Sequence, residues 1–115
     1  MKVIFYQTAR GRSPVVDDID SLPTEAAAHA YQLLEEVEEH GFNAPRLTFR
    51  HMQGKIWEIK MILPGIGAYR IFYFIAEGST MVLLHAYSKK TKKAPRRHIE
   101  TAIQRMAEAI QRGGL

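Results

Sequence analysis

Residues 55–88 read KIWEIKMILPGIGAYRIFYFIAEGSTMVLLHAYS, and this segment contains three runs rich in β-branched and aromatic residues. The runs cover about residues 55–63, 68–76 and 80–88. They are separated by PGIG at 64–67 and EGS at 77–79, which are typical turn sequences. Because turns this short join antiparallel neighbours, the segment predicts three consecutive antiparallel strands.

The flanking segments add two strands and three helices. Residues 2–8 and 46–51 have the composition of strands. A serine close to a proline, at 13–14 and again at 21–23, is typical of a helix start and predicts a short helix over 15–19 and a longer one to about residue 40. The longer helix has apolar residues at helical spacing, namely Ala27, Ala30, Leu33, Leu34 and Val37. Pro95 predicts the start of a final helix, whose apolar positions are Ile99, Ala102, Ile103, Met106, Ala109 and Ile110.

These elements predict an α+β fold in one domain over residues 1–115: a twisted, mostly antiparallel β-sheet with two N-terminal helices and a C-terminal helix. A chain of this length can bury one sizeable core. No low-complexity tract interrupts it.

Charge is distributed unevenly along the chain. The net charge is +4, but eight of the twelve acidic residues lie between positions 17 and 39. From residue 40 onward, thirteen Lys and Arg outnumber four Asp and Glu, a local balance of +9. A basic region of this kind predicts a surface that meets an anion, either nucleic acid or an acidic protein.

Several other functional classes find no support in the sequence. No apolar run reaches the roughly 18–20 residues that a membrane span requires, and residues 1–6 are interpreted as a strand rather than a signal peptide. The chain has no cysteine, which excludes thiolate metal sites and disulfides and fits a reducing cytoplasm. The five histidines lack metal-ligand spacing, and no glycine-rich loop joins a strand to a helix. We expect a cytoplasmic protein with a cationic site and without a metal or other cofactor.

Two cations fall inside the apolar strands. The turn at 64–67 should bring Lys60 and Arg70 to neighbouring positions of a hairpin. Like charges in apolar strands cost free energy unless an anion or solvent meets them. One possibility is a bound phosphate, and the other is that Glu58 neutralises one of the two cations.

A basic segment follows the last strand. His85 and Tyr87 precede it, and its cations are Lys89, Lys90, Lys92, Lys93, Arg96 and Arg97. We expect Tyr87 and these lysines to meet Lys60 and Arg70 at one end of the sheet, where they could hold a phosphodiester. Alternatively, the segment is a solvated connector, and His85 is a half-buried structural histidine. We interpret Phe72 and Phe74, on the same face, as core residues rather than base-stacking ones.

The sequence resembles the phage-associated HigB branch of the RelE-type toxins. The resemblance rests on WEIK at 57–60, YRIFYF at 69–74, LLHAYSKKTKKAP at 83–95, and IE at 99–100. The order of elements agrees over nearly the whole chain, including DSLP at 20–23. It implies a RelE-like fold and the toxin of a type II toxin–antitoxin pair, a nuclease that enters the ribosomal A site and cuts translated messenger RNA. In that reaction the ribose 2′-OH attacks the adjacent phosphate without a metal and leaves a cyclic phosphate.

The resemblance also suggests roles for individual residues. Arg70 matches a strand arginine suited to stabilising charge on phosphate, and Lys60 matches a lysine that stabilises charge or acts as base. Tyr87 could stack on a base or donate a proton. Lys89 and Lys90 match basic residues of the catalytic site, and the candidates for gripping the RNA backbone are Lys55, Lys92, Lys93, Arg96 and Arg97.

The final helix lacks the tyrosine that some relatives carry near the C-terminus, so Tyr87, His85 and Lys60 all stay open as proton carriers. The implied partners are a small helix-turn-helix antitoxin, the ribosome and its mRNA. Two other functions remain alternatives: a non-enzymatic toxin of the same fold that poisons a target such as DNA gyrase, and an inactive domain that only binds nucleic acid.

Overall fold

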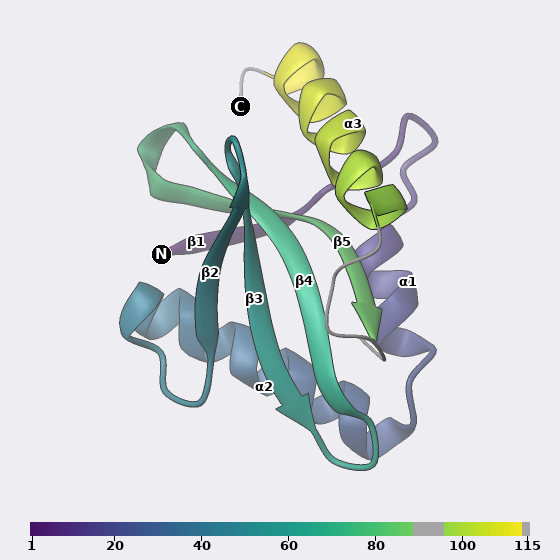
Figure 1. The fold of residues 1–115 in the computed structure, drawn as a ribbon, viewed down its shortest axis with the longest axis vertical. Coiled ribbons are helices and arrows are strands. Elements are labelled where there is room, and N and C mark those ends of the chain that lie inside the picture. Colours follow the sequence, from purple (N-terminus) through teal and green to yellow (C-terminus); the bar gives the residue numbers. More distant parts are fainter. Residues whose placement is uncertain (89–95, 114–115) are drawn as a thin grey trace.

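Five strands form one sheet with the order β1-β5-β4-β3-β2 in the computed structural model, which describes residues 1–88 and 96–113 (Figure 1). The strands are β1 (Lys2–Phe5), β2 (Thr48–Gln53), β3 (Ile56–Leu63), β4 (Gly67–Ala76) and β5 (Thr80–Ser88). The helices are α1 (Pro14–Asp20), α2 (Thr24–His40) and α3 (Arg96–Gly113), with short 3-10 turns η1 (Gly41–Asn43) and η2 (Glu77–Ser79). The predicted α+β fold is confirmed.

Strands β2 to β5 pair antiparallel, as the short turns predict, and β1 lies parallel to β5. The hairpin between β3 and β4 places Lys60 opposite Arg70, which confirms the predicted register. The parallel pair requires a long crossover, and α1 and α2 lie in the chain between β1 and the rest of the sheet.

The sheet separates two apolar layers. Helices α1 and α2 cover one face and α3 lies on the other (Figure 1). Alternation along β3 and β4 directs Ile59 and Ile71 toward α1 and α2, and Phe72 and Phe74 toward α3. Because Phe72 and Phe74 are fully or almost fully buried, their interpretation as core residues is confirmed.

Strand β5 contains a β-bulge that alternation alone does not predict. Phe72 pairs with His85, whereas the next residue, Tyr73, pairs with Leu83, so Leu84 is an extra residue in the ladder. An unbroken register from the η2 turn would place Ala86 opposite Arg70. The bulge places Tyr87 there instead, on the α3 face.

The element ends differ locally from the predictions. Strand β2 begins at Thr48 rather than residue 46, because Arg46 has a positive φ of 67° that a strand does not allow. Ser21 does not cap α2. Its hydroxyl donates instead to the carbonyl of Asp18 at 2.6 Å and closes α1. Pro95, predicted to open the last helix, lies outside the described residues.

No helix in the described ranges is long and apolar enough to cross a membrane.

Candidate functional site

The α3 face of the sheet is covered only in part by the helix that packs on it. In Figure 1, α3 crosses the end of the sheet near β5, and much of β2, β3 and β4 faces the viewer with no helix of the described residues over it. Ile62 of β3 is 59% exposed on this face. An apolar residue so exposed marks where the cover ends, and the polar residues of the site lie between this point and α3.

A buried carboxylate lies at the centre of this region. Glu58 is only 1% exposed, and its Oε1 lies 2.6 Å from Nη1 of Arg70 and 3.4 Å from Nη2 of Arg50. The hydroxyl of Tyr87 donates to its Oε2 at 3.3 Å. The predicted alternative, in which Glu58 neutralises a strand cation, is therefore what the structure shows for Arg70. A buried carboxylate needs such partners because desolvation disfavours its charge.

Arg70 is held by Glu58, but only some of its N–H groups form hydrogen bonds with the described residues. Its side chain is 11% exposed, and Nη1 is the nitrogen that binds Glu58. Its Nε is buried and has no hydrogen-bond partner among the described residues. Because a guanidinium has five N–H donors, Arg70 keeps N–H groups that could donate hydrogen bonds to an anion.

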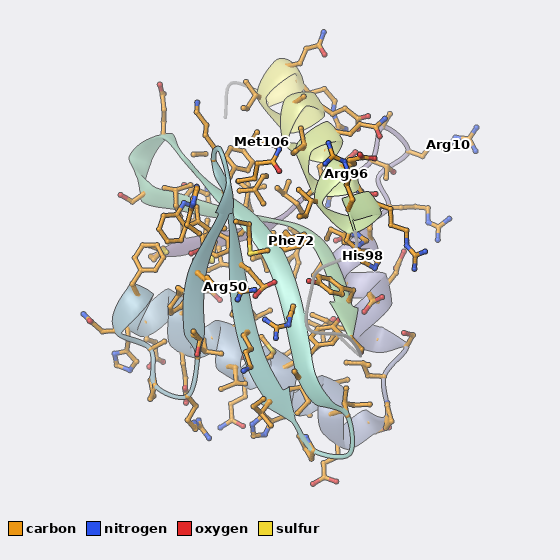
Figure 2. All side chains as sticks on the ribbon, in the orientation of Figure 1. Arg10, Arg50, Phe72, Arg96, His98 and Met106 are labelled. Carbon is orange, nitrogen blue, oxygen red and sulfur yellow. The ribbon has the colours of Figure 1, made fainter. Side chains whose placement is uncertain are left out.

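Three cations share this face of the sheet with the one carboxylate. Arg50, Lys60 and Arg70 carry three positive charges against the single negative charge of Glu58, so the cluster has a net charge of +2. The Arg50 side chain is 53% exposed, and Lys60 is half-buried beside Arg70. Figure 2 shows Arg50 over the open part of the sheet. We call these four residues, with Tyr87, the Glu58 cluster.

A pair of histidines lies next to this cluster. The ring of His98, at the start of α3, stacks on Tyr87 with centroids 4.4 Å apart and an interplanar angle of 13°. Its Nδ1 lies 2.6 Å from Nε2 of His85. Figure 2 labels His98 beside β5 and Phe72 on the neighbouring strand. The Glu58 cluster therefore has two titratable imidazoles beside it.

Both histidines are held neutral at physiological pH. Burial, together with the charge of Arg105 and with repulsion from His98 when His98 is protonated, lowers the pKa of His85 to about 4. Burial and the charge of Arg97 lower the pKa of His98, against an opposing effect of Asp18. Tyr87 keeps its proton, because burial and the Glu58 carboxylate raise its pKa.

Sequence reasoning did not identify His98 or Arg105 as site residues. They are seven residues apart, about two helical turns, so both can face β5 from one side of α3. That spacing, combined with the His85 of the preceding strand, is a signal that the sequence does contain. It is weak, because it becomes informative only after the pairing of α3 with β5 is known.

The structure brings together Lys60, Arg70 and Tyr87, which were predicted to meet. Lys89, Lys90, Lys92 and Lys93 lie outside the described residues.

The other predicted RNA-binding residues are exposed and are not part of the Glu58 cluster. Arg96 and Arg97 are exposed at the start of α3, where Arg96 pairs with Glu100 at 2.9 Å. Lys55 is exposed in the turn between β2 and β3. It is five residues from Lys60 along the chain, roughly 17 Å in an extended strand.

A separate apolar hollow of about 560 Å³ lies on the opposite face of the sheet, lined by Phe42, Phe49, Trp57, Tyr73 and Ile75. No residue of the Glu58 cluster lines it. Trp57 is the one tryptophan of the chain and is 39% exposed there. It therefore supplies an intrinsic fluorescence signal that is independent of the cationic face.

A family model described as phage-derived protein Gp49-like (DUF891) matches residues 17–107. The match includes the whole Glu58 cluster, both histidines and Arg105. No curated protein matches the chain.

Proposed function

The chain belongs to the phage-derived Gp49-like family, a family of RelE/HigB-like toxins, and from this membership we propose that it is the toxin of a type II toxin–antitoxin pair. Its activity in this proposal is the endonucleolytic cleavage of messenger RNA on the translating ribosome, which stops protein synthesis. The proposal joins the family to the chemistry of the Glu58 cluster.

The proposed reaction is an internal transesterification. The ribose 2′-oxygen forms a bond to the adjacent phosphorus while the bond from phosphorus to the 5′-oxygen breaks. The 2′-OH proton goes to a base, and the leaving 5′-oxygen receives a proton from an acid. The products are a 2′,3′-cyclic phosphate and a 5′-OH end. Negative charge grows on the phosphate oxygens in the transition state, so fixed cations accelerate the reaction most effectively.

The net charge of +2 in the Glu58 cluster is the observation that carries the proposal. Arg50 and Lys60 are accessible and can meet the phosphate directly, while Glu58 fixes Arg70 behind them. The Nε of Arg70 is a buried donor without a partner in the described part of the chain, and a hydrogen bond to a phosphate oxygen would offset the free-energy cost of burying it. Preorganised donors of this kind are suited to charge that develops during a reaction.

The hydroxyl of Tyr87 is bound to Glu58 and is therefore not free to contact the phosphate. It donates to Glu58, and its raised pKa keeps it protonated. Proton transfer by Tyr87 would first require this hydrogen bond to break. In the proposed mechanism the buried Tyr87 ring therefore supports His98, which stacks on it, and Lys60 is the candidate that touches the phosphate.

The proposed partners follow from the same chemistry. A toxin must be held inactive in its own cell, and we propose a small helix-turn-helix antitoxin as the protein that does so. The basic region from residue 40 onward, with its balance of +9, suits ribosomal RNA and mRNA. The exposed acidic side chains of α2, Glu35, Glu38 and Glu39, suit neither.

Induced expression in bacteria tests the proposal. We expect growth arrest with cleaved messages for the natural sequence, and relief of both for Lys60→Ala and Arg70→Ala. Arg10→Ala is the matched control, because Arg10 points away from the molecule (Figure 2) and its loss removes the same charge. Trp57 fluorescence confirms that each variant folds. Full cleavage by both site variants would contradict the site; arrest with intact RNA would indicate a non-enzymatic toxin, and harmless expression an inactive binding domain.

A further inference from the structure

Three side chains form a continuous hydrogen-bonded series between α3 and β5. Nη1 of Arg105 donates to the carbonyl of Leu84 at 2.9 Å and lies 3.2 Å from Nδ1 of His85. Nε2 of His85 lies 2.6 Å from Nδ1 of His98. Arg105 is partly buried, and the residue it holds, Leu84, is the extra residue of the β-bulge.

The chemistry of Arg105 fixes the direction of this series. A guanidinium donates hydrogen bonds and cannot accept them, so Nδ1 of His85 must be the acceptor. Because a neutral imidazole carries one proton, that of His85 is on Nε2 and is donated to Nδ1 of His98. Neutral His98 must then carry its own proton on Nε2.

We propose that Arg105 is a positioning residue that fixes His98 as the Nε2–H tautomer, so that His98 offers the substrate a hydrogen-bond donor and not a base. The proposal rests on the function proposed above, because its substrate is the RNA phosphate at the Glu58 cluster. His98 stacks on Tyr87, whose hydroxyl binds Glu58, and this contact places the imidazole next to the cationic group. The donor would bind a phosphate oxygen, and the 2′-OH proton goes to a group other than His98.

Protonation of His98 would disturb the whole series. A charged His98 would carry a proton on Nδ1, facing the Nε2–H of His85. His85 could accept only by moving its proton to Nδ1, where it would face Arg105. The lowered pKa of His85 agrees with this conflict, since Arg105 is among its causes after burial.

The other groups around His98 have opposing effects. Arg97 on the same helix lowers its pKa, and Asp18 of α1 raises it. Tyr87 of β5 is neutral and stacks on the His98 ring. His85 is also neutral, and its Nε2–H points at Nδ1 of His98. Arg105 therefore decides the tautomer, while Arg97 and Asp18 adjust the charge.

Nitrogen-15 NMR of the imidazole rings tests the proposal directly on the full chain. At pH 7 we expect the Nε2–H form for both His85 and His98. Arg105→Met keeps much of the apolar stem and removes the donor, so we expect a mixture of tautomers at both rings and a roughly tenfold gain in the proton affinity of His85. Arg105→Lys should preserve the Nε2–H form, because an ammonium also only donates.

Arg112→Met is the control, because it removes the same charge from the same helix. Both arginines lie over the Tyr6 ring, but Arg112 donates to the Gln7 carbonyl, whereas Arg105 binds Leu84 and His85. A protonated Nδ1 on His98 in the natural sequence, or tautomers unchanged by Arg105→Met, would overturn the proposal. A merely structural role for Arg105 would lower stability without changing the tautomers.

The pH profile of RNA cleavage supplies the functional readout. Loss of activity at low pH should begin at higher pH in Arg105→Met than in the natural sequence, because the histidines of the variant gain protons more readily. If the natural chain cleaves no RNA but shows the expected tautomers, the proposed function fails and the tautomer assignment stands. If it cleaves RNA but has the opposite tautomer, the positioning role of Arg105 fails.

Discussion

At the scale of single residues, the central feature is one buried carboxylate shared by several partners. Glu58 is almost fully buried and binds Arg70, Arg50 and Tyr87. The sequence contained this possibility, because Glu58 and Arg70 fall on one face of a predicted hairpin. It could not decide whether Arg70 met Glu58 or an external anion, since both satisfy a cation within an apolar strand.

The interaction of Glu58 with Arg70 predicts strong coupling in stability. Removing one partner leaves the other charged and buried, so Arg70→Met alone should lower the free energy of unfolding by about 3–5 kcal/mol. The double variant Glu58→Met with Arg70→Met should lose clearly less than the sum of the two single losses. Urea unfolding followed by Trp57 fluorescence measures all four proteins. Additive losses would mean that the pair is not coupled.

The low pKa of His85 predicts a stability that depends on pH. The folded chain holds this pKa at about 4, against about 6.5 in the unfolded chain, so below pH 6.5 the unfolded state binds the proton more tightly. Stability is therefore complete above this value and falls as the pH decreases toward 4. Allowing for the partial exposure of His85, the loss should reach about 2 kcal/mol.

Urea unfolding between pH 7 and pH 4 measures this loss, and His85→Asn is the control for all other titrations. The difference between the two proteins should shrink as the pH falls. A constant difference would show that His85 titrates alike in the folded and unfolded chains.

At the scale of elements, the strands and helices follow from local sequence, but their alignment does not. Turn residues and apolar spacing predicted β3, β4, β5 and α2 with small errors at their ends. The bulge at Leu84 has no local signal, yet it determines that Tyr87 rather than Ala86 lies opposite Arg70. It is explained by tertiary contacts: Leu84 packs in the α3 layer, and Arg105 binds its carbonyl.

Close packing of α3 on the sheet predicts a size limit at Ala102. This residue is fully buried against the layer that contains Phe72 and Val82, so Ala102→Leu should overpack it and lower the free energy of unfolding by about 1–3 kcal/mol. It should also weaken the stacking of His98 on Tyr87. Ala107→Leu, on the exposed side of the same helix, is the control and should change stability little. Equal effects of both changes in urea unfolding would show that α3 is not closely packed.

At the scale of the whole molecule, acidic and cationic side chains lie on opposite sides of the sheet. Helix α2 covers one face of the sheet (Figure 1) and has exposed acidic side chains, and the Glu58 cluster lies on the other face. The sequence predicted this asymmetry, because most acidic residues lie between positions 17 and 39 and most basic residues lie after position 40. It could not predict the histidine series, since His85, His98 and Arg105 meet only when α3 packs on β5.

Cleavage of a defined message by the purified chain on translating ribosomes is the decisive measurement. We expect new RNA ends at the A-site codon, with a 2′,3′-cyclic phosphate on the upstream fragment and a 5′-OH on the downstream one. Lys60→Ala should abolish these ends, because it removes a cation that is accessible to the phosphate. Arg10→Ala should leave them unchanged. Intact message on ribosomes that the natural chain has stopped, or equal cleavage by Lys60→Ala, would contradict the proposed nuclease and its site.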